Sequence, residues 1–132
     1  MPLVFVLYGS LRRGEEGHRQ LDLGRRLRYL MPCTVRGRLF DLGAYPAFVA
    51  GEGIIHGDLC EAADPAILAD LDAFEEYDPD RPANSLYLRE RVALIEPRRE
   101  AFIYRYNGPF DGFPEIASGD WVAYRAARDA RP

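Results

Sequence analysis

The chain opens with an unbroken apolar run at 3–8, made only of aliphatic and aromatic residues. Such a run predicts a strand that is buried on both faces. Shorter apolar runs, separated by glycine and proline, predict further strands at 34–40, 47–49, 54–60, 86–95 and 101–106. The pattern therefore predicts about six short strands.

Two segments carry the wider apolar spacing of helices. Between 18 and 30, three leucines are loosely helical in spacing, although Gly24 weakens the pattern. Asp64-Pro65 is typical of an N-cap followed by proline at the first helical position. It predicts a helix from 65 to about 76.

The acids of this helix can be ordered by its phase, at about 100° per residue. The apolar positions form one face: Ile67, Leu71 and Phe74. Glu75 lies at the margin of that face, whereas Asp72 and Glu76 are turned further toward solvent. Partial burial raises the pKa of a carboxyl group and suits it to proton transfer near neutrality. Most acids at helix ends are surface charges, so phase alone leaves both interpretations of Glu75 open.

A loop and a strand follow the predicted helix. Proline, aspartate and asparagine make 78–85 a loop. In the strand after it, Tyr87 and Arg89 are two residues apart and therefore face the same side of the sheet. A core edge and a pocket wall are equally compatible with this pair.

Together these elements predict an α+β, β-rich fold. It is either a small mixed β-barrel flanked by one to three helices or a sheet closed on itself. A length of 132 residues, with 48% hydrophobic and 29% charged residues, is ordinary for one globular domain. We therefore expect a single domain over 1–132, with a core at about 3–124 and a ragged C-terminal tail.

Charge narrows the classes of partner. A net charge of −4 argues against nucleic acid, because phosphate contacts need a basic surface. Arg12-Arg13 and the basic segment 25–28 are local exceptions, which we interpret as solvated surface.

The candidate metal ligands are scattered along the chain. Cys33 and Cys60 form no CxxC pair and lie in apolar strand-like runs, so buried free thiols are expected. His18 and His56 have no second ligand at a suitable spacing. The sequence therefore predicts no metal site.

The first residues decide the expected location. The apolar run that ends in strand 3–8 is short, and no basic segment precedes it. A signal peptide and a membrane span both need longer apolar stretches. We therefore expect a cytoplasmic protein that does not bind membranes.

The strand at 3–8 runs into the segment Tyr8-Gly9-Ser10-Leu11. Gly9 allows a tight turn and close approach of a ligand, and a turn here leaves successive backbone N–H groups unpaired. Such groups bind carboxylates or developing oxyanions. The segment matches neither a Walker loop nor GxGxxG, and Ser10 lacks a GxSxG elbow. On the local sequence alone, an ordinary strand-to-loop turn is the favoured interpretation.

The chain resembles the γ-glutamylcyclotransferase-like family, which includes the AIG2-like proteins. The likeness spans about 3–124 and rests on motifs whose order and spacing are specific: YGSLRRG at 8–14, GRLFDLGAYP at 37–46, GDL at 57–59, LDAFE at 71–75, YLR at 87–89 and SGDW at 118–121.

The resemblance implies a small β-barrel flanked by helices and an enzyme of the lyase or acyltransferase type. Members cleave γ-glutamyl amides by attack of the free α-amine on its own γ-carbonyl, which releases 5-oxoproline and an amine. The tethered nucleophile supplies proximity, so no cofactor is needed. The implied partner is a small γ-glutamyl molecule, and we expect a monomer or a weak homodimer.

Carried over by position, the resemblance makes Glu75 the catalytic acid and base. It implies that Tyr8, Gly9, Ser10 and Leu11 hold the glutamyl carboxylate or the carbonyl oxygen. Tyr87 is expected to bind substrate in the same site. The leaving group is expected to meet the loop at 78–85.

Three positions depart from the family pattern. Glu76 stands where glycine usually follows the catalytic glutamate, and Gly-Asp-Leu-Cys at 57–60 replaces Gly-Glu-Leu-Tyr. An asparagine or histidine often follows the first glycine-rich loop in the family; here the nearest such residue is His18, which comes only after two glutamates. An alternative hypothesis is therefore a non-catalytic module that binds a small anionic metabolite, and a third is nucleotide binding through Gly9-Ser10 and the neighbouring arginines.

Overall fold

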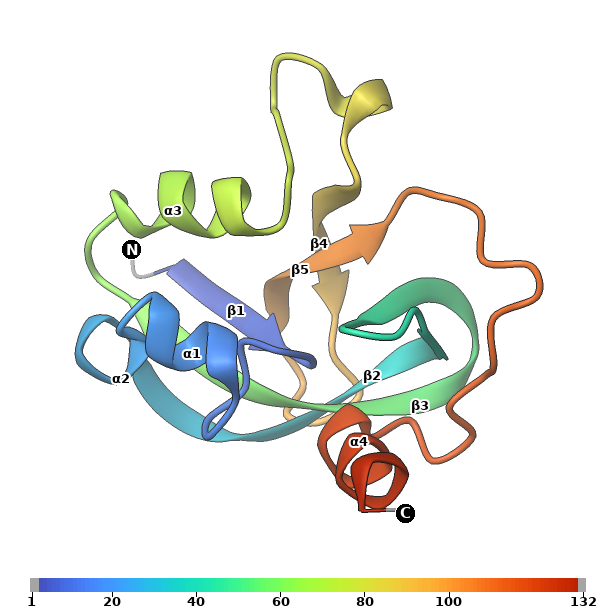
Figure 1. The fold of residues 1–132 in the computed structure, drawn as a ribbon. Helices are drawn as coiled ribbons and strands as arrows, with labels where there is room; N and C mark the ends of the chain where they lie inside the picture. The colour runs from blue at the N-terminus through green and yellow to red at the C-terminus, as the bar shows by residue number, and fades with distance from the viewer. Residues whose placement is uncertain (1–2, 131–132) are drawn as a thin grey trace.

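Strand β1 (Leu3–Leu7) is the middle strand of a five-stranded sheet in the order β2-β3-β1-β5-β4 (Figure 1). The computed structural model describes residues 3–130, so the ends of the predicted 1–132 domain lie outside the described residues. β1 pairs antiparallel with β3 and parallel with β5. Residues 4–7 are buried, as an unbroken apolar run predicts.

The strands at 34–40, 47–49 and 54–60 are parts of two long strands, which corrects the predicted number and length. They are β2 (Arg28–Asp41) and β3 (Pro46–Ala62), paired as one hairpin. Glycines inside the hairpin accommodate a bend and do not end a strand. A Cβ on Gly53 would lie 2.8 Å from the carbonyl oxygen of Gly37, next to a register shift between the strands.

A second hairpin, β4 (Tyr87–Ala93) with β5 (Glu100–Tyr106), completes the mixed sheet. An isolated bridge joins Thr34 in β2 to Glu96, just after β4. Within residues 3–130 no continuous ladder closes the sheet into a barrel. The predicted α+β class is confirmed, and the sheet is strongly curved and open (Figure 1).

The helices are short. The predicted helix at 18–30 is instead α1 (Glu16–Gln20) and α2 (Leu23–Arg26), followed directly by β2. Asp22 breaks it with a left-handed φ of 54°. The remaining helices are α3 (Ile67–Phe74), the 3-10 turn η1 (Pro82–Asn84) and α4 (Trp121–Asp129). Asp64 binds the amide of Ala66 through its carboxylate at 2.9 Å, so it caps the turn that leads into α3.

Alternating residues of β1 pack on opposite faces of the sheet, as strand geometry requires. Val4 and Val6 belong to one cluster with Trp121 of α4. Phe5 and Leu7 belong to the other, which contains residues of α2 and α3. Figure 1 shows α3 and α4 on opposite sides of β1. The end of β1 is therefore packed from both faces.

The two cysteines are free and buried, as predicted. Cys33 packs in the cluster with Trp121 and Cys60 in the other. Burial raises the pKa of each thiol to about 12.

Candidate active site

A small pocket opens where β1 ends. All six site residues predicted from the sequence line it: Tyr8, Gly9, Ser10, Leu11, Glu75 and Tyr87. The structure therefore brings the glycine-containing turn, the end of α3 and the start of β4 together in one place.

The turn after β1 presents its backbone to this pocket. Within residues 3–130, the amide N–H groups of Gly9, Ser10 and Leu11 donate to no other protein group. The turn is closed from behind, because the amide of Arg12 donates to the carbonyl oxygen of Gly9 at 3.0 Å. We call residues 9–11 the cradle. Its N–H groups are available to an anionic or carbonyl oxygen.

Gly9 is required by close packing. A Cβ on Gly9 would lie 2.9 Å from two ring carbons of Pro46, at the start of β3. Pro46 also accepts a hydrogen bond from the hydroxyl of Tyr87 at 2.7 Å. These contacts fix the cradle against the β2–β3 turn and β4.

The end of α3 places Glu75. The amide of Tyr77 donates to the carbonyl oxygen of Asp72 at 2.8 Å, and that of Glu76 to Ala73 at 3.2 Å. These two bonds form a Schellman motif, with Glu76 in the left-handed position at a φ of 54°. Glycine normally adopts this left-handed conformation, which gives a physical reason for the glycine of the family pattern, whereas here Glu76 adopts it. The Glu76 side chain is exposed and does not line the pocket.

The carboxylate of Glu75 lies in the pocket without a hydrogen-bond partner among residues 3–130. Burial alone raises the pKa of Glu75 to about 8. Such a group is mostly protonated at neutral pH, and its pKa is close enough to neutrality for it to exchange a proton.

Three buried tyrosines of the pocket lining, Tyr8, Tyr87 and Tyr104, interact electrostatically with this carboxyl group. Burial, followed by nearby charged or hydroxyl groups that include Glu75, raises the pKa of Tyr8 and of Tyr87. Both hydroxyls therefore stay neutral donors. Tyr8 donates to the carbonyl oxygen of Tyr104 at 2.6 Å. The tyrosines line the pocket with rings whose polar ends are already bonded.

Asp72 is buried, so the prediction that it faces solvent is wrong. The carboxylate of Asp72 accepts from Arg89 through both oxygens, at 2.6 and 2.5 Å. It also accepts from the hydroxyl of Tyr104 at 2.6 Å. These partners compensate the burial of the charge. Arg89 of β4 thus pairs with α3 and does not line the pocket, whereas Tyr87 does.

Sequence reasoning missed five lining residues: Val6 and Leu7 of β1, and Tyr45, Pro46 and Tyr104. Tyr45 and Pro46 end the family-like motif GRLFDLGAYP at 37–46, and this motif could have pointed to them. Tyr104 lies in a strand with no local signal. No residue of the loop 78–85 lines the pocket, so the expected contact between this loop and the leaving group has no support from the pocket lining.

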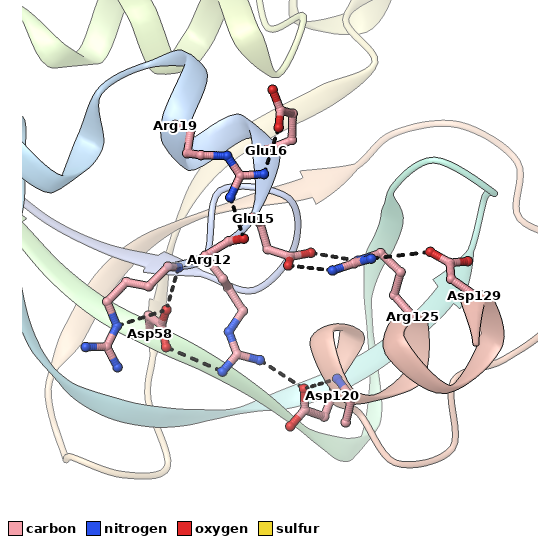
Figure 2. A network of polar contacts seen from close by, with 11 residues as sticks. Arg12, Glu15, Glu16, Arg19, Asp58, Asp120, Arg125 and Asp129 are labelled. Carbon is pink, nitrogen blue, oxygen red and sulfur yellow. Dashed lines mark hydrogen bonds and ion pairs between the residues drawn. The ribbon is translucent and has the colours of Figure 1, made fainter.

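Ion pairs hold the chain that follows the cradle (Figure 2). The buried carboxylate of Asp58 in β3 accepts from the backbone amide of Arg13 at 3.2 Å and from the side chain of Arg12 at 3.4 Å. Arg12 also donates to Asp120, at the start of α4, at 3.0 Å. Because Asp58 engages both arginines, they are poorly placed to bind a nucleotide phosphate.

Other predicted features lie away from the pocket. His18 bonds the carbonyl oxygen of Leu11 through Nδ1 at 2.9 Å, and His56 is exposed. In the part of the chain that the structure describes, no three His, Cys, Asp or Glu side chains gather as metal ligands. None of its helices is long and apolar enough to cross a membrane.

Comparisons with known proteins found one matching family and several similar proteins. The family described as "Gamma-glutamyl cyclotransferase, AIG2-like" matches residues 4–123. The chain is 38% identical over 120 residues to the gamma-glutamylcyclotransferase family protein YtfP of Escherichia coli K12, which covers 90% of this chain and 95% of that protein. It is 28% identical over 126 residues to the gamma-L-glutamyl-butirosin B gamma-glutamyl cyclotransferase of Niallia circulans, covering 95% of this chain and 78% of that one. The solution NMR structure of Escherichia coli ytfP superposes with a TM-score of 0.67 at 29% identity, over 93% of this chain and 99% of that one.

Proposed function

Because this chain belongs to the gamma-glutamyl cyclotransferase, AIG2-like family, we propose that it cleaves a γ-glutamyl amine or γ-glutamyl amino acid to 5-oxoproline and a free amine. The observation that carries this proposal is the desolvated carboxyl of Glu75, with a pKa of about 8, in one pocket with the unpaired cradle amides. The relative from Niallia circulans, named as a cyclotransferase of a γ-glutamyl conjugate, supports the same reaction class.

The reaction needs one group that moves protons. The α-nitrogen of the glutamyl group forms a bond to the γ-carbonyl carbon, and the bond from that carbon to the leaving nitrogen breaks. The attacking nitrogen loses protons and the leaving nitrogen gains them, so no water or cofactor is consumed. Glu75 takes a proton from the α-ammonium and delivers one to the leaving nitrogen.

The environment of Glu75 suits both halves of this transfer. In the free protein its raised pKa keeps much of the carboxyl group protonated at neutral pH. A bound ammonium group lowers that pKa, because an opposite charge stabilises the carboxylate. The residue therefore becomes a base when substrate arrives, and an acid again once the ammonium has lost its charge.

The cradle holds the glutamyl group. Its amides at Gly9, Ser10 and Leu11 would bind either the α-carboxylate or the oxygen of the tetrahedral intermediate. Tyr8 and Tyr87 would form walls whose hydroxyls are already bonded. The pocket therefore constrains the flexible glutamyl chain toward ring closure, which is where proximity supplies rate.

A direct test is to incubate the protein with several γ-glutamyl amines and γ-glutamyl dipeptides and to quantify 5-oxoproline. We expect turnover of at least one compound and a loss of at least about 100-fold for Glu75→Gln. Glu76→Gln is the matched control, because this neighbouring acid is exposed and outside the pocket. Absence of 5-oxoproline from every compound, or full rate for Glu75→Gln, would overturn the proposal.

The non-catalytic alternative makes a different prediction for the same samples. A binding module would be stabilised by stoichiometric γ-glutamyl compounds without forming product. One reason for considering this alternative was the replacement of glycine by Glu76. That reason is weakened, because Glu76 keeps the left-handed backbone and is exposed to solvent. Thermal stabilisation without 5-oxoproline would favour it.

A further inference from the structure

The lining of the candidate active site carries no charged side chain besides Glu75 in the described part of the chain. Its other titratable groups are tyrosines from the end of β1, the β2–β3 turn, β4 and β5: Tyr8, Tyr45, Tyr87 and Tyr104. Tyrosine hydroxyls are neutral near pH 7. Glu76, the acid that follows Glu75, is exposed, so solvent screens its charge. Other charges close to Glu75 therefore belong to residues outside the lining.

One such charge lies on α3 itself. Asp72 comes three residues before Glu75, and residues at that spacing are neighbours on a helix surface. The carboxylate of Asp72 accepts from the hydroxyl of Tyr104 at 2.6 Å. Burial, followed by this bond, raises the pKa of Tyr104, and the charge of Glu75 adds to the rise. Asp72 and Glu75 therefore both act on one hydroxyl group, and both carboxyl groups lie near it.

Arg89 of β4 supplies the opposite charge. Its Nη1 donates to both carboxylate oxygens of Asp72, at 2.6 and 2.5 Å. The pair is largely buried, with 20% of the Arg89 side chain and 10% of the Asp72 side chain exposed. Together with the bond from Tyr104, it joins the end of α3 to β4 and β5. The raised pKa of Glu75 is caused by burial, which agrees with a pair that exerts no net charge on it.

We propose that Asp72 and Arg89 are positioning residues that keep the surroundings of Glu75 electrically neutral until substrate binds. This inference rests on the proposed cyclotransferase function and deepens it. In that reaction Glu75 becomes a base when the α-ammonium group of the substrate arrives beside it. A permanent positive charge nearby would release the proton before substrate binds, and a permanent negative charge would hold the proton afterwards. Mutual neutralisation of Asp72 and Arg89 leaves this switch to the substrate.

Removal of either charge alone should move the titration of Glu75, in opposite directions. Asp72→Asn keeps the shape of the side chain and leaves Arg89 unpaired, so we expect the pKa of Glu75 to fall by about one pH unit. Arg89→Met leaves Asp72 unpaired, so we expect a rise of about one pH unit. The double variant carries neither charge and should titrate like the unmodified protein.

NMR of isotope-labelled glutamate carboxyl carbons follows this titration in the free protein, and Glu75→Gln identifies the resonance. The ion pair of Glu90 and Arg105, with contacts at 2.9 and 2.8 Å between β4 and β5, is the matched control because neither residue lines the pocket. Glu90→Gln and Arg105→Met should leave the titration of Glu75 unchanged.

A purely structural role for the pair predicts a different pattern. Both single variants would then loosen the site, admit water and lower the pKa of Glu75, or leave it unchanged. Shifts of the same sign, or no shift in either variant, would overturn the proposal.

A buried charge without its partner destabilises a fold, whereas replacement of both partners by neutral groups is tolerated better. If Arg89→Met does not fold, Asp72→Asn is compared with the double variant. We expect the lowered pKa of Glu75 to return to its original value in the double variant. A pKa that stays lowered there would indicate loosening and overturn the proposal.

The titration needs no substrate, so it separates this inference from the proposed function. For a γ-glutamyl compound that is turned over, the pH midpoint of kcat/KM should move with the NMR titration in each variant. A midpoint that stays fixed while the titration moves would overturn the role of the pair in the reaction. Absence of 5-oxoproline from every compound would instead overturn the cyclotransferase function, whatever the titration shows.

Discussion

Replacing Glu75 with glutamine should remove a pH dependence from the stability of the protein. Burial raises the pKa of Glu75 from 4.5 to about 8. The native state therefore holds a proton that the unfolded chain has released between these values, and the free energy of unfolding falls as pH rises through this window. The stabilisation from the protonated carboxyl is complete below about pH 4.5 and is lost by about pH 8.

The structure also sets the size of this effect. Each pKa unit corresponds to about 1.4 kcal/mol, so the full separation gives about 5 kcal/mol. Glu75 is half-buried as a residue and faces a pocket that opens to solvent, which reduces the effective value. We expect the unfolding free energy to fall by about 2–4 kcal/mol between about pH 5 and about pH 9 because of this group.

Urea denaturation at these two pH values measures the effect. Glutamine cannot ionise, so the stability of Glu75→Gln relative to the unmodified protein should rise by about 2–4 kcal/mol from the lower pH to the higher. Other titrating groups cancel in this comparison. Glu76→Gln, at the exposed neighbouring position, should show no such rise. If the two variants behave alike, Glu75 is not desolvated in the native state, and the argument that its raised pKa suits it to proton transfer is refuted.

Glu76→Gly should stabilise the fold by about 0.5–1 kcal/mol in urea denaturation, because the residue has a left-handed φ of 54°; no gain would contradict the strain. Gly9→Ala should cost about 1–3 kcal/mol and lower turnover, because its Cβ meets a proline ring. Gly24→Ala, where the nearest atom is 3.9 Å away, is its control. Cys33 and Cys60 should resist a thiol reagent at about pH 8 until denaturant is added, because burial raises the pKa of each thiol to about 12.

Local signals predicted the parts of the fold that local physics decides. The run at 3–8 is apolar at every position, and only a strand buried on both faces accommodates that pattern. The division of β2 and β3 into shorter strands failed for the opposite reason. A glycine between apolar runs is compatible both with a turn that ends a strand and with a bend inside a continuous strand of a hairpin. Which of the two forms depends on whether a facing strand comes close to the glycine.

The candidate site shows the same limit. Helix phase put Glu75 at the margin of the buried face, and the pocket includes it. Helix phase placed Asp72 toward solvent. Asp72 is instead buried, because Arg89 of β4 and Tyr104 of β5 contact its carboxylate. Helix phase describes one element, whereas the burial of a charge depends on partners that only the tertiary structure supplies.

The departure at Glu76 separates what a backbone requires from what a residue type prefers. The Schellman motif needs two hydrogen bonds and one left-handed residue, and both bonds form here with glutamate in that position. Glutamate adopts this conformation at an energetic cost, while glycine adopts it freely. The direction of the preceding Glu75 is set by the bonds and not by the residue that follows. The substitution therefore lowers stability at the end of α3 and leaves the carboxylate in the pocket, so it counts against neither the geometry nor the proposed chemistry.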